Sequence, residues 1–258
     1  MRLMKRILSA AAVLALSASL LVGCSSGTAS SVPVSASSAA ESTVSSVEET
    51  ASSAVDENEA AAAQLLNDLT GSYQELWPVI LADEYKQTWL DVCTALVGED
   101  NAEAAFEKLS SMVTGDVYGE DAVKAYANGG GAYFCGFTNS LATLTFDGET
   151  STISGTDKDG NVLFSHTYHY IGMEPVHGLY EFESDDADSG EFTYFFLAPD
   201  TSAETYHIEF RYGSDADALS QYDAGDYAYW VASGISTDCD QTMIDNCIEL
   251  FCTENLAG

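Results

Sequence analysis

The chain has 258 residues, with 41 acidic side chains, 8 basic ones and a formal charge of −33 at pH 7. This charge excludes a protein that binds nucleic acid or adheres electrostatically to anionic lipid headgroups, because both surfaces repel it. A high negative charge mostly promotes solubility, so alone it does not indicate a metal site.

The N-terminus has the order of features of a bacterial lipoprotein precursor. Three basic residues precede an apolar and small-residue run from Ile7 to Val22, which has about the length of a signal-peptide core. The run ends in the sequence LVGC at residues 21–24, which resembles a lipobox. Residues 1–23 are therefore predicted to be a lipoprotein signal peptide, with a lipid on Cys24. The alternative is an ordinary secretory signal with a chance cysteine.

The segment that follows predicts a tether. Residues 24–62 are rich in Ser, Ala, Val, Thr and Glu, and no aromatic residue occurs before Tyr73. Such a composition buries too little apolar area to offset its chain entropy, so we expect a disordered linker with helix beginning near Glu57. Residues 63–258 are then one domain of ordinary size. The only membrane contact expected is the lipid, which places the domain outside the cytoplasm.

The domain begins with helix signals. Apolar residues at helical spacing predict helices over Glu75–Leu96 and Asn101–Met112, after a stripe formed by Leu65, Leu66 and Leu69. Asp121–Ala127 adds a short helix before the triple glycine at 129–131. The tail from Thr237 to Glu254 predicts a closing helix.

Short strands separated by turn residues follow the helices. The predicted strands are Ala132–Phe137, Ala142–Phe146, Thr150–Gly155, Val162–Ile171, Leu179–Glu183, Glu191–Leu197, Tyr206–Tyr212 and Tyr227–Ala232. About eight strands joined mostly by short turns indicate an antiparallel barrel or sandwich. The class is α+β, a helical N-terminal segment packed on an antiparallel sheet.

The five cysteines beyond Cys24 leave their pairing open. They are Cys93, Cys135, Cys239, Cys247 and Cys252. No CxxC pair is present, so neither a zinc ribbon nor a thioredoxin-type motif is indicated. Disulfides are permitted outside the cytoplasm, and buried unpaired thiols are the alternative.

The strand Tyr206–Tyr212 carries the most informative polar residues. Strict alternation puts His207 and Glu209 on one face, where both can ligate one divalent ion. The alternative is a strand with one core face and one solvated polar face. His166 and His169 lie on opposite faces of their own strand and are not expected to share an ion.

Four short motifs in order resemble the ZinT family, the YodA-like or metal-binding lipocalin-like domain also found in zinc-uptake lipoproteins of the AdcA type. They are the segments at residues 69–80, 168–172 (YHYIG), 180–183 (YEFE), and the strand pair at 194–200 and 207–213. In the opening segment the family's glycine and proline are Gly71 and Pro78, whereas its two tryptophans are replaced by Leu69 and Tyr73. The family's histidine-rich N-terminal loop is absent.

The resemblance implies a small calycin-like (lipocalin-like) barrel that holds zinc at its mouth. Carried over residue by residue, the family's three histidine ligands fall on Asp200, His207 and Glu209, so two of the three are carboxylates here. The fourth ligand is expected to be water, or else His166 or His177 brought in by the barrel. Carboxylates still ligate zinc, and they also suit calcium, manganese or magnesium.

These observations lead to a non-enzymatic, lipid-anchored protein that captures a divalent metal, zinc first, at the cell surface. A metal-uptake transporter component is the expected partner, and nucleic acid is not. The alternative is a degenerate module of this fold that binds a small ligand or a cell-surface partner without metal. A secreted hydrolase lacks support because no nucleophile–base pair is visible in the sequence.

Overall fold

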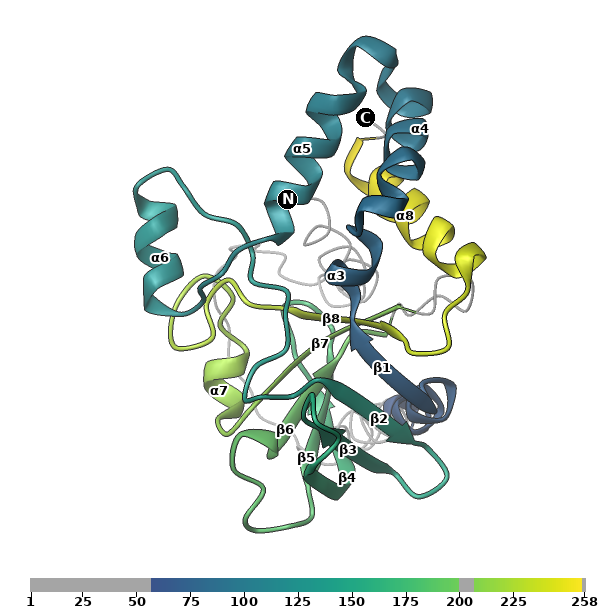
Figure 1. The fold of residues 1–258 in the computed structure, drawn as a ribbon. Coiled ribbons are helices and arrows are strands. Elements are labelled where there is room, and N and C mark those ends of the chain that lie inside the picture. Colours follow the sequence, from purple (N-terminus) through teal and green to yellow (C-terminus); the bar gives the residue numbers. More distant parts are fainter. Residues whose placement is uncertain (1–56, 200–206, 257–258) are drawn as a thin grey trace, which may run out of the picture.

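The computed structural model describes residues 57–199 and 207–256. Their eight strands form one closed antiparallel barrel, in which each strand pairs with the next and β8 returns to pair with β1 (Figure 1). The strands are β1 (Gly71–Glu75), β2 (Thr143–Asp147), β3 (Thr152–Thr156), β4 (Val162–Met173), β5 (Tyr180–Ser184), β6 (Tyr194–Leu197), β7 (His207–Gly213) and β8 (Ala232–Ser236). The predicted α+β class and antiparallel barrel are confirmed.

The inside of the barrel is filled by side chains. Successive residues of a strand point to opposite faces, so Ile208 and Phe210 of β7 point inward while their neighbours point out. Phe146, Phe182 and Phe195 are each 1% exposed or less and pack in the same cluster. The barrel is therefore a packed core, and any site for chemistry lies at its ends or on its outer face.

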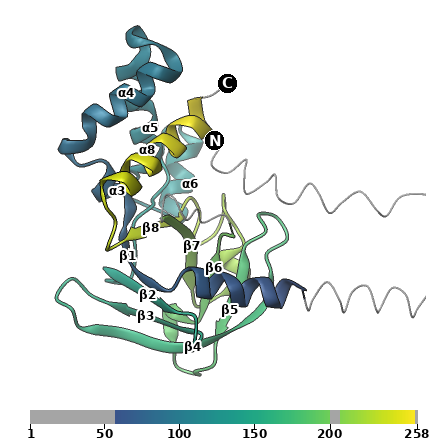
Figure 2. The ribbon, with the colours of Figure 1, turned by 90° about the vertical axis from the view of Figure 1, so that its right-hand side faces the viewer.

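The helices gather mainly at one end of the barrel. They are α3 (Leu76–Ile80), α4 (Lys86–Val97), α5 (Ala102–Val113), α6 (Glu120–Ala127), α7 (Ala216–Leu219) and α8 (Gln241–Leu256). Figure 2 shows α3, α4, α5 and α8 above the strands, and the helix at residues 57–68 along the barrel's side. Ala62 of that helix, placed in the tether by composition, is fully buried in the barrel core. None of the helices in these ranges is long and apolar enough to span a bilayer.

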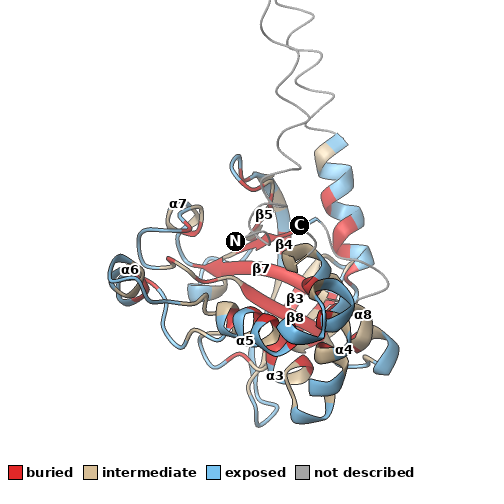
Figure 3. Cartoon of the chain, turned by 90° about the horizontal axis from the view of Figure 1, so that it is seen from above, coloured by how far each residue is buried: buried red, intermediate tan, exposed pale blue. Residues whose placement is uncertain are grey.

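A second core lies between the helices and the outer face of β8. Trp89 of α4 is fully buried, and its indole Nε1 donates a hydrogen bond to the carbonyl oxygen of Ile80 at 2.7 Å. Phe251 of α8 packs its ring edge-on against Trp77, with 4.7 Å between ring centroids. The predicted closing helix is confirmed, and these contacts fix it on α3 and α4. Figure 3 shows β7 and β8 buried next to these helices, whose outer surfaces are exposed.

The long helix predicted over Glu75–Leu96 is wrong, because the segment is broken into α3, a 3-10 turn (Asp83–Tyr85) and α4. Ala82 adopts an extended conformation with ψ of 146°. The helix is interrupted there, and Trp77 and Trp89, on either side of the break, pack against the same Phe251 ring. Tertiary packing therefore overrides the helical periodicity.

Two predicted strands are also wrong. Ala132–Phe137 forms only isolated bridges, from Phe134 to Thr114 and to Trp230. In Tyr227–Ala232, the first three residues form a turn, Trp230 makes only an isolated bridge, and β8 starts at the last residue. The eighth barrel position is taken instead by β1, a strand that the sequence did not indicate. Because β1 and β8 close the barrel, no free edge remains on which Ala132–Phe137 could add.

Candidate metal centre

The polar side chains of β7 lie under the helices. His207 and Glu209 leave the face opposite to Ile208 and Phe210, as the alternation predicted. Glu209 is only 8% exposed, so the alternative in which this face is solvated is wrong. On β8, the partner of His207 is Ile235, which belongs to the helical core. The pair therefore sits on the outer wall of the barrel, between β7 and the helical layer.

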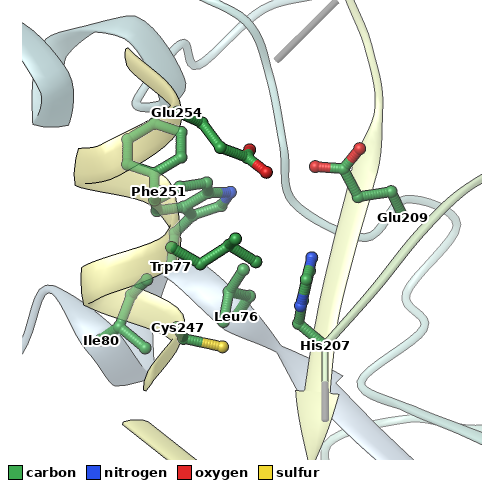
Figure 4. A pocket seen from close by; sticks show the side chains of 9 residues that line it. Leu76, Trp77, Ile80, His207, Glu209, Cys247, Phe251 and Glu254 are labelled. Carbon is green, nitrogen blue, oxygen red and sulfur yellow. The ribbon is translucent and has the colours of Figure 1, made fainter. Parts of the chain in front are cut away.

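A small cavity of about 20 Å³ lies at this junction. Its lining comes from β7, α3 and α8 and consists of Leu76, Trp77, Ile80, His207, Glu209, Cys247, Leu250, Phe251 and Glu254. A space of that size holds one water-sized group or one ion. Figure 4 shows the Glu209 and Glu254 carboxylates facing each other across it, with the His207 ring between strand and helix.

Two buried donors near the cavity approach one thiol. Trp77 Nε1 and Ser233 Oγ have no oxygen or nitrogen acceptor among the residues that the structure describes, and both approach the Cys135 sulfur. In Figure 4 the Trp77 nitrogen points toward the space between helix and strand. Burial and then the nearby negative charge of Glu209 raise the pKa of the Cys135 thiol, while the approach of Trp77 and Ser233 to its sulfur opposes this rise. The junction is thus a mostly apolar pocket that a few polar groups line.

The arrangement of donors is incomplete as it stands. Across residues 57–199 and 207–256, no three His, Cys, Asp or Glu side chains are grouped closely enough to hold a metal ion. A full coordination shell therefore requires side-chain movement or a donor from elsewhere in the chain. Asp200, the third predicted ligand, lies outside the described residues, as does the predicted lipidation site Cys24.

The other two histidines proposed from the sequence are engaged away from this cavity. His166 shares an inward face of β4 with Phe164 and Tyr168, and its Nδ1 lies 2.6 Å from Asp186 Oδ2. His177, in the loop between β4 and β5, is buried, with its Nδ1 3.2 Å from Glu174 Oε2. Neither side chain lines the cavity with His207.

His177 belongs to a separate buried stack. Its ring lies on that of Tyr222 with 3.7 Å between centroids, and the Arg211 guanidinium covers Tyr222 at 4.2 Å from the ring centroid. Arg211 is fully buried and donates hydrogen bonds to the backbone carbonyls of Leu219, Gln221 and Tyr227. This stack ties the segment after β7 to the strand that carries Glu209, and so it fixes the strand's position.

Glu254 is the cavity residue that sequence reasoning missed. Acidic residues are too abundant for one carboxylate to stand out, and Glu254 is remote in sequence from His207. The usable signal is helical spacing. Cys247, Phe251 and Glu254 fall on one stripe of α8, at positions i, i+4 and i+7, and the first two are buried. A carboxylate at the end of a buried stripe indicates a polar partner beneath the helix.

Comparisons with known proteins give structural matches only. No protein-family model and no curated protein sequence matches the chain. Among solved structures, the chain is similar to the Zn(II)-bound ZinT-like domain of Streptococcus pneumoniae AdcA. The TM-score is 0.44 at 14% identity, over 70% of this chain and 87% of that domain.

The full Zn(II)-bound AdcA of Streptococcus pneumoniae gives a TM-score of 0.43 at 14% identity, over 72% of this chain. The match covers 35% of AdcA, so the chain spans only about a third of that longer protein. The candidate metal centre is therefore assigned from this chain's own residues.

Proposed function

We propose that this protein is an extracytoplasmic, lipid-anchored protein that binds a divalent cation, with His207 and Glu209 as ligands. The observation that supports it is that both side chains leave the covered face of β7 and line one cavity of ion size. An imidazole and a carboxylate two residues apart on a strand reach the same ion. Asp200 is proposed as a further ligand.

Zinc is the proposed ion because of the donors around the cavity. Imidazole suits zinc, and the thiol of Cys247, which also lines the cavity, is a softer donor than calcium or magnesium prefers. In the cell we propose that the protein binds metal without catalysing a reaction and passes it to an uptake component.

Elemental analysis of the full chain, purified without a histidine tag, tests the proposal. We expect zinc in the wild type and its loss in His207→Ala, whereas His169→Ala keeps the metal. His169 is a matched control because it is a half-exposed histidine whose ring contacts Asp185 and does not line the cavity. Equal metal content in the two variants would contradict the assignment of His207.

The anchor is tested separately from the metal. We propose a lipid on Cys24 as the sole strong attachment to the membrane, so Cys24→Ala should move the processed protein to the soluble fraction. Membrane retention of that variant after a high-salt wash would contradict the lipoprotein assignment.

A second function is favoured by one other observation. A cavity of about 360 Å³ lies beyond Trp77 and Cys135, lined largely by apolar side chains including Leu81, Val113 and Phe134. Its size is in the range of small-molecule sites. If the wild type contains no metal and binds none in solution, a small-ligand-binding module of this fold takes the place of the metal-binding protein.

A further inference from the structure

Two cysteines face each other where the last helix packs on the helical layer. Cys93 lies on α4 and Cys252 on α8, and their Sγ atoms are 4.0 Å apart. The two helices pack against each other, and both side chains are fully buried in the core between helices and barrel. Both are thiols in the structure. The fold therefore brings together two sulfurs that are 159 residues apart in the sequence.

The contact is close enough for a bond to form without rearrangement of the helices. A disulfide bond is about 2 Å long, so the two sulfurs have to approach by about 2 Å. Rotation about the Cα–Cβ bonds supplies a movement of about 1 Å on each side. The backbones are already held together on both sides of the contact. Trp89, one turn before Cys93, packs edge-on against Phe251, the residue before Cys252.

Burial decides when such a bond can form. Burial raises the pKa of the Cys93 thiol, and burial followed by the neighbouring Cys93 sulfur raises the pKa of the Cys252 thiol. The thiolate is the form that attacks a disulfide, and the oxidant has to reach it. We therefore expect the bond to form during folding, before α8 docks. Once the helix has packed, the bond is shielded from reductants.

We propose that Cys93 and Cys252 form a disulfide that fastens α8 to α4 in the exported protein. The inference goes beyond cation binding and rests on the proposed extracytoplasmic location, because disulfides persist in oxidising compartments.

The oxidant in this reaction is a disulfide donor. One cysteine thiolate attacks a sulfur of the donor, releases one donor thiolate and forms a mixed disulfide. The second cysteine thiolate then attacks the cysteine sulfur of the mixed disulfide and releases the second donor thiolate. The two cysteines lose two electrons and two protons, which the donor takes up as two thiols.

The cross-link closes most of the domain into one loop. Every strand except β1 lies between the two cysteines, together with α5, α6 and α7. A cross-link across a loop of about 160 residues removes much of the conformational entropy of the unfolded chain. α8 also carries Cys247 and Phe251, which line the candidate metal centre. The disulfide therefore stabilises the domain and holds the helix that forms one wall of that cavity.

Peptide mapping of the full chain tests the pairing. The protein is reduced and unfolded, refolded with reduced and oxidised glutathione, alkylated with iodoacetamide and digested without reduction. Cleavage after glutamate separates Cys252 from Cys247, because Glu249 lies between them. We expect a linked pair of peptides that contain Cys93 and Cys252. Free thiols at both positions, or a link from either one to another cysteine, would overturn the inference.

Thermal unfolding measures what the cross-link contributes. The oxidised wild type should unfold about 5–15 °C above wild type that is refolded in a phosphine reductant. In Cys93→Ala this difference should vanish, whereas Cys247→Ala should keep it. Cys247 is the matched control because it is another buried cysteine of α8. Each protein is compared with its own reduced form, so the cost of removing a thiol cancels. Equal unfolding temperatures for oxidised and reduced wild type would overturn the stabilising role.

Protein trapped with iodoacetamide in the cells that export it separates the pairing from the location. We expect the same linked peptides there. Free thiols in the cells, with the link present after refolding, would overturn the disulfide in the exported protein and would contradict the proposed location. Absence of the link in both preparations would overturn the pairing alone. Cation binding is measured by metal content, so it stands or fails independently of this disulfide.

Discussion

Arg211 provides a quantitative test of how the site strand is held. Its guanidinium is fully buried, donates to three backbone carbonyls of the segment after β7, and lies 4.2 Å from the Tyr222 ring centroid. Burial lowers the pKa of the guanidinium, while the neighbouring Tyr222 opposes that change. The substitution Arg211→Met keeps the aliphatic stem and removes every donor.

The expected cost follows from the carbonyls left behind. A hydrogen bond from a charged donor contributes about 1.5–3 kcal/mol, and a buried acceptor that loses its donor costs about 1–3 kcal/mol. In the wild type, the desolvation of the buried guanidinium offsets part of the stabilisation from these hydrogen bonds. The free energy of unfolding should therefore fall by about 3–5 kcal/mol, a large part of the 5–15 kcal/mol typical of a domain.

Urea denaturation followed by tryptophan fluorescence measures this loss, because Trp89 and Trp230 are both fully buried and report the helical and barrel cores. Lys124→Met is a control for removing a positive charge, since Lys124 is an exposed residue of α6 that pairs with Asp121 at 3.0 Å. The control should shift the urea midpoint little. A loss below about 1 kcal/mol in Arg211→Met would refute the idea that this side chain anchors the segment to β7.

Two further predictions concern titration and thiol reactivity. Burial raises the pKa of the Glu174 carboxyl, but hydrogen bonds from the ring and amide of His177 and from a second backbone amide outweigh it, so this pKa is lowered from its usual 4.5. The stabilisation from this carboxylate is therefore present above about pH 4.5 and is lost as the pH falls below that value. The difference in the free energy of unfolding between wild type and Glu174→Gln should shrink as the pH falls. A difference that grows would contradict the lowered pKa. Alkylation of the reduced native protein at pH 8.5, read by peptide mass spectrometry, should modify the partly exposed Cys239 before the buried Cys93 and Cys252. Burial raises the pKa of all three thiols, so access to the sulfur sets the order, and the reverse order would refute the packing of α4 on α8.

Local pattern predicted much of the barrel. The alternation around Ile208 and Phe210 gave the correct inward face of β7, and the spacing of Ile244, Ile248 and Phe251 gave the closing helix. Both features depend on residues near one another in sequence, where period-2 and period-3.6 signals are reliable.

The predictions that were wrong concern features that depend on contacts between segments distant in sequence. Nothing near Gly71 shows that β1 closes the barrel against β8, and nothing near Leu81 shows that the helix must break so that two tryptophans meet one phenylalanine. The burial of Glu209 beneath α8 is another feature of this kind. A solvated strand face and a face under a helix have the same alternation, so only the packing of α8 distinguishes them.

The site was predicted in part for the same reason. His207 and Glu209 lie on one strand, so their shared face could be inferred, whereas Glu254 joins them only through the tertiary fold. His166 and His177 were candidates for the fourth ligand because an imidazole can ligate zinc. The structure instead pairs His166 with Asp186, which follows the neighbouring strand β5, and His177 with Glu174, three residues before it.

Calorimetric titration of zinc into the wild-type chain at pH 7.5 and pH 5.5 tests the proposed metal site most directly. An imidazole must be neutral to ligate and has an unperturbed pKa of about 6.5, so binding through His207 should be clear at pH 7.5 and much weaker at pH 5.5. His207→Ala should lose most of the affinity at pH 7.5. If the wild type at pH 7.5 binds neither zinc, manganese nor calcium below roughly millimolar concentrations, the weak end of protein metal sites, the protein is not a metal-binding protein.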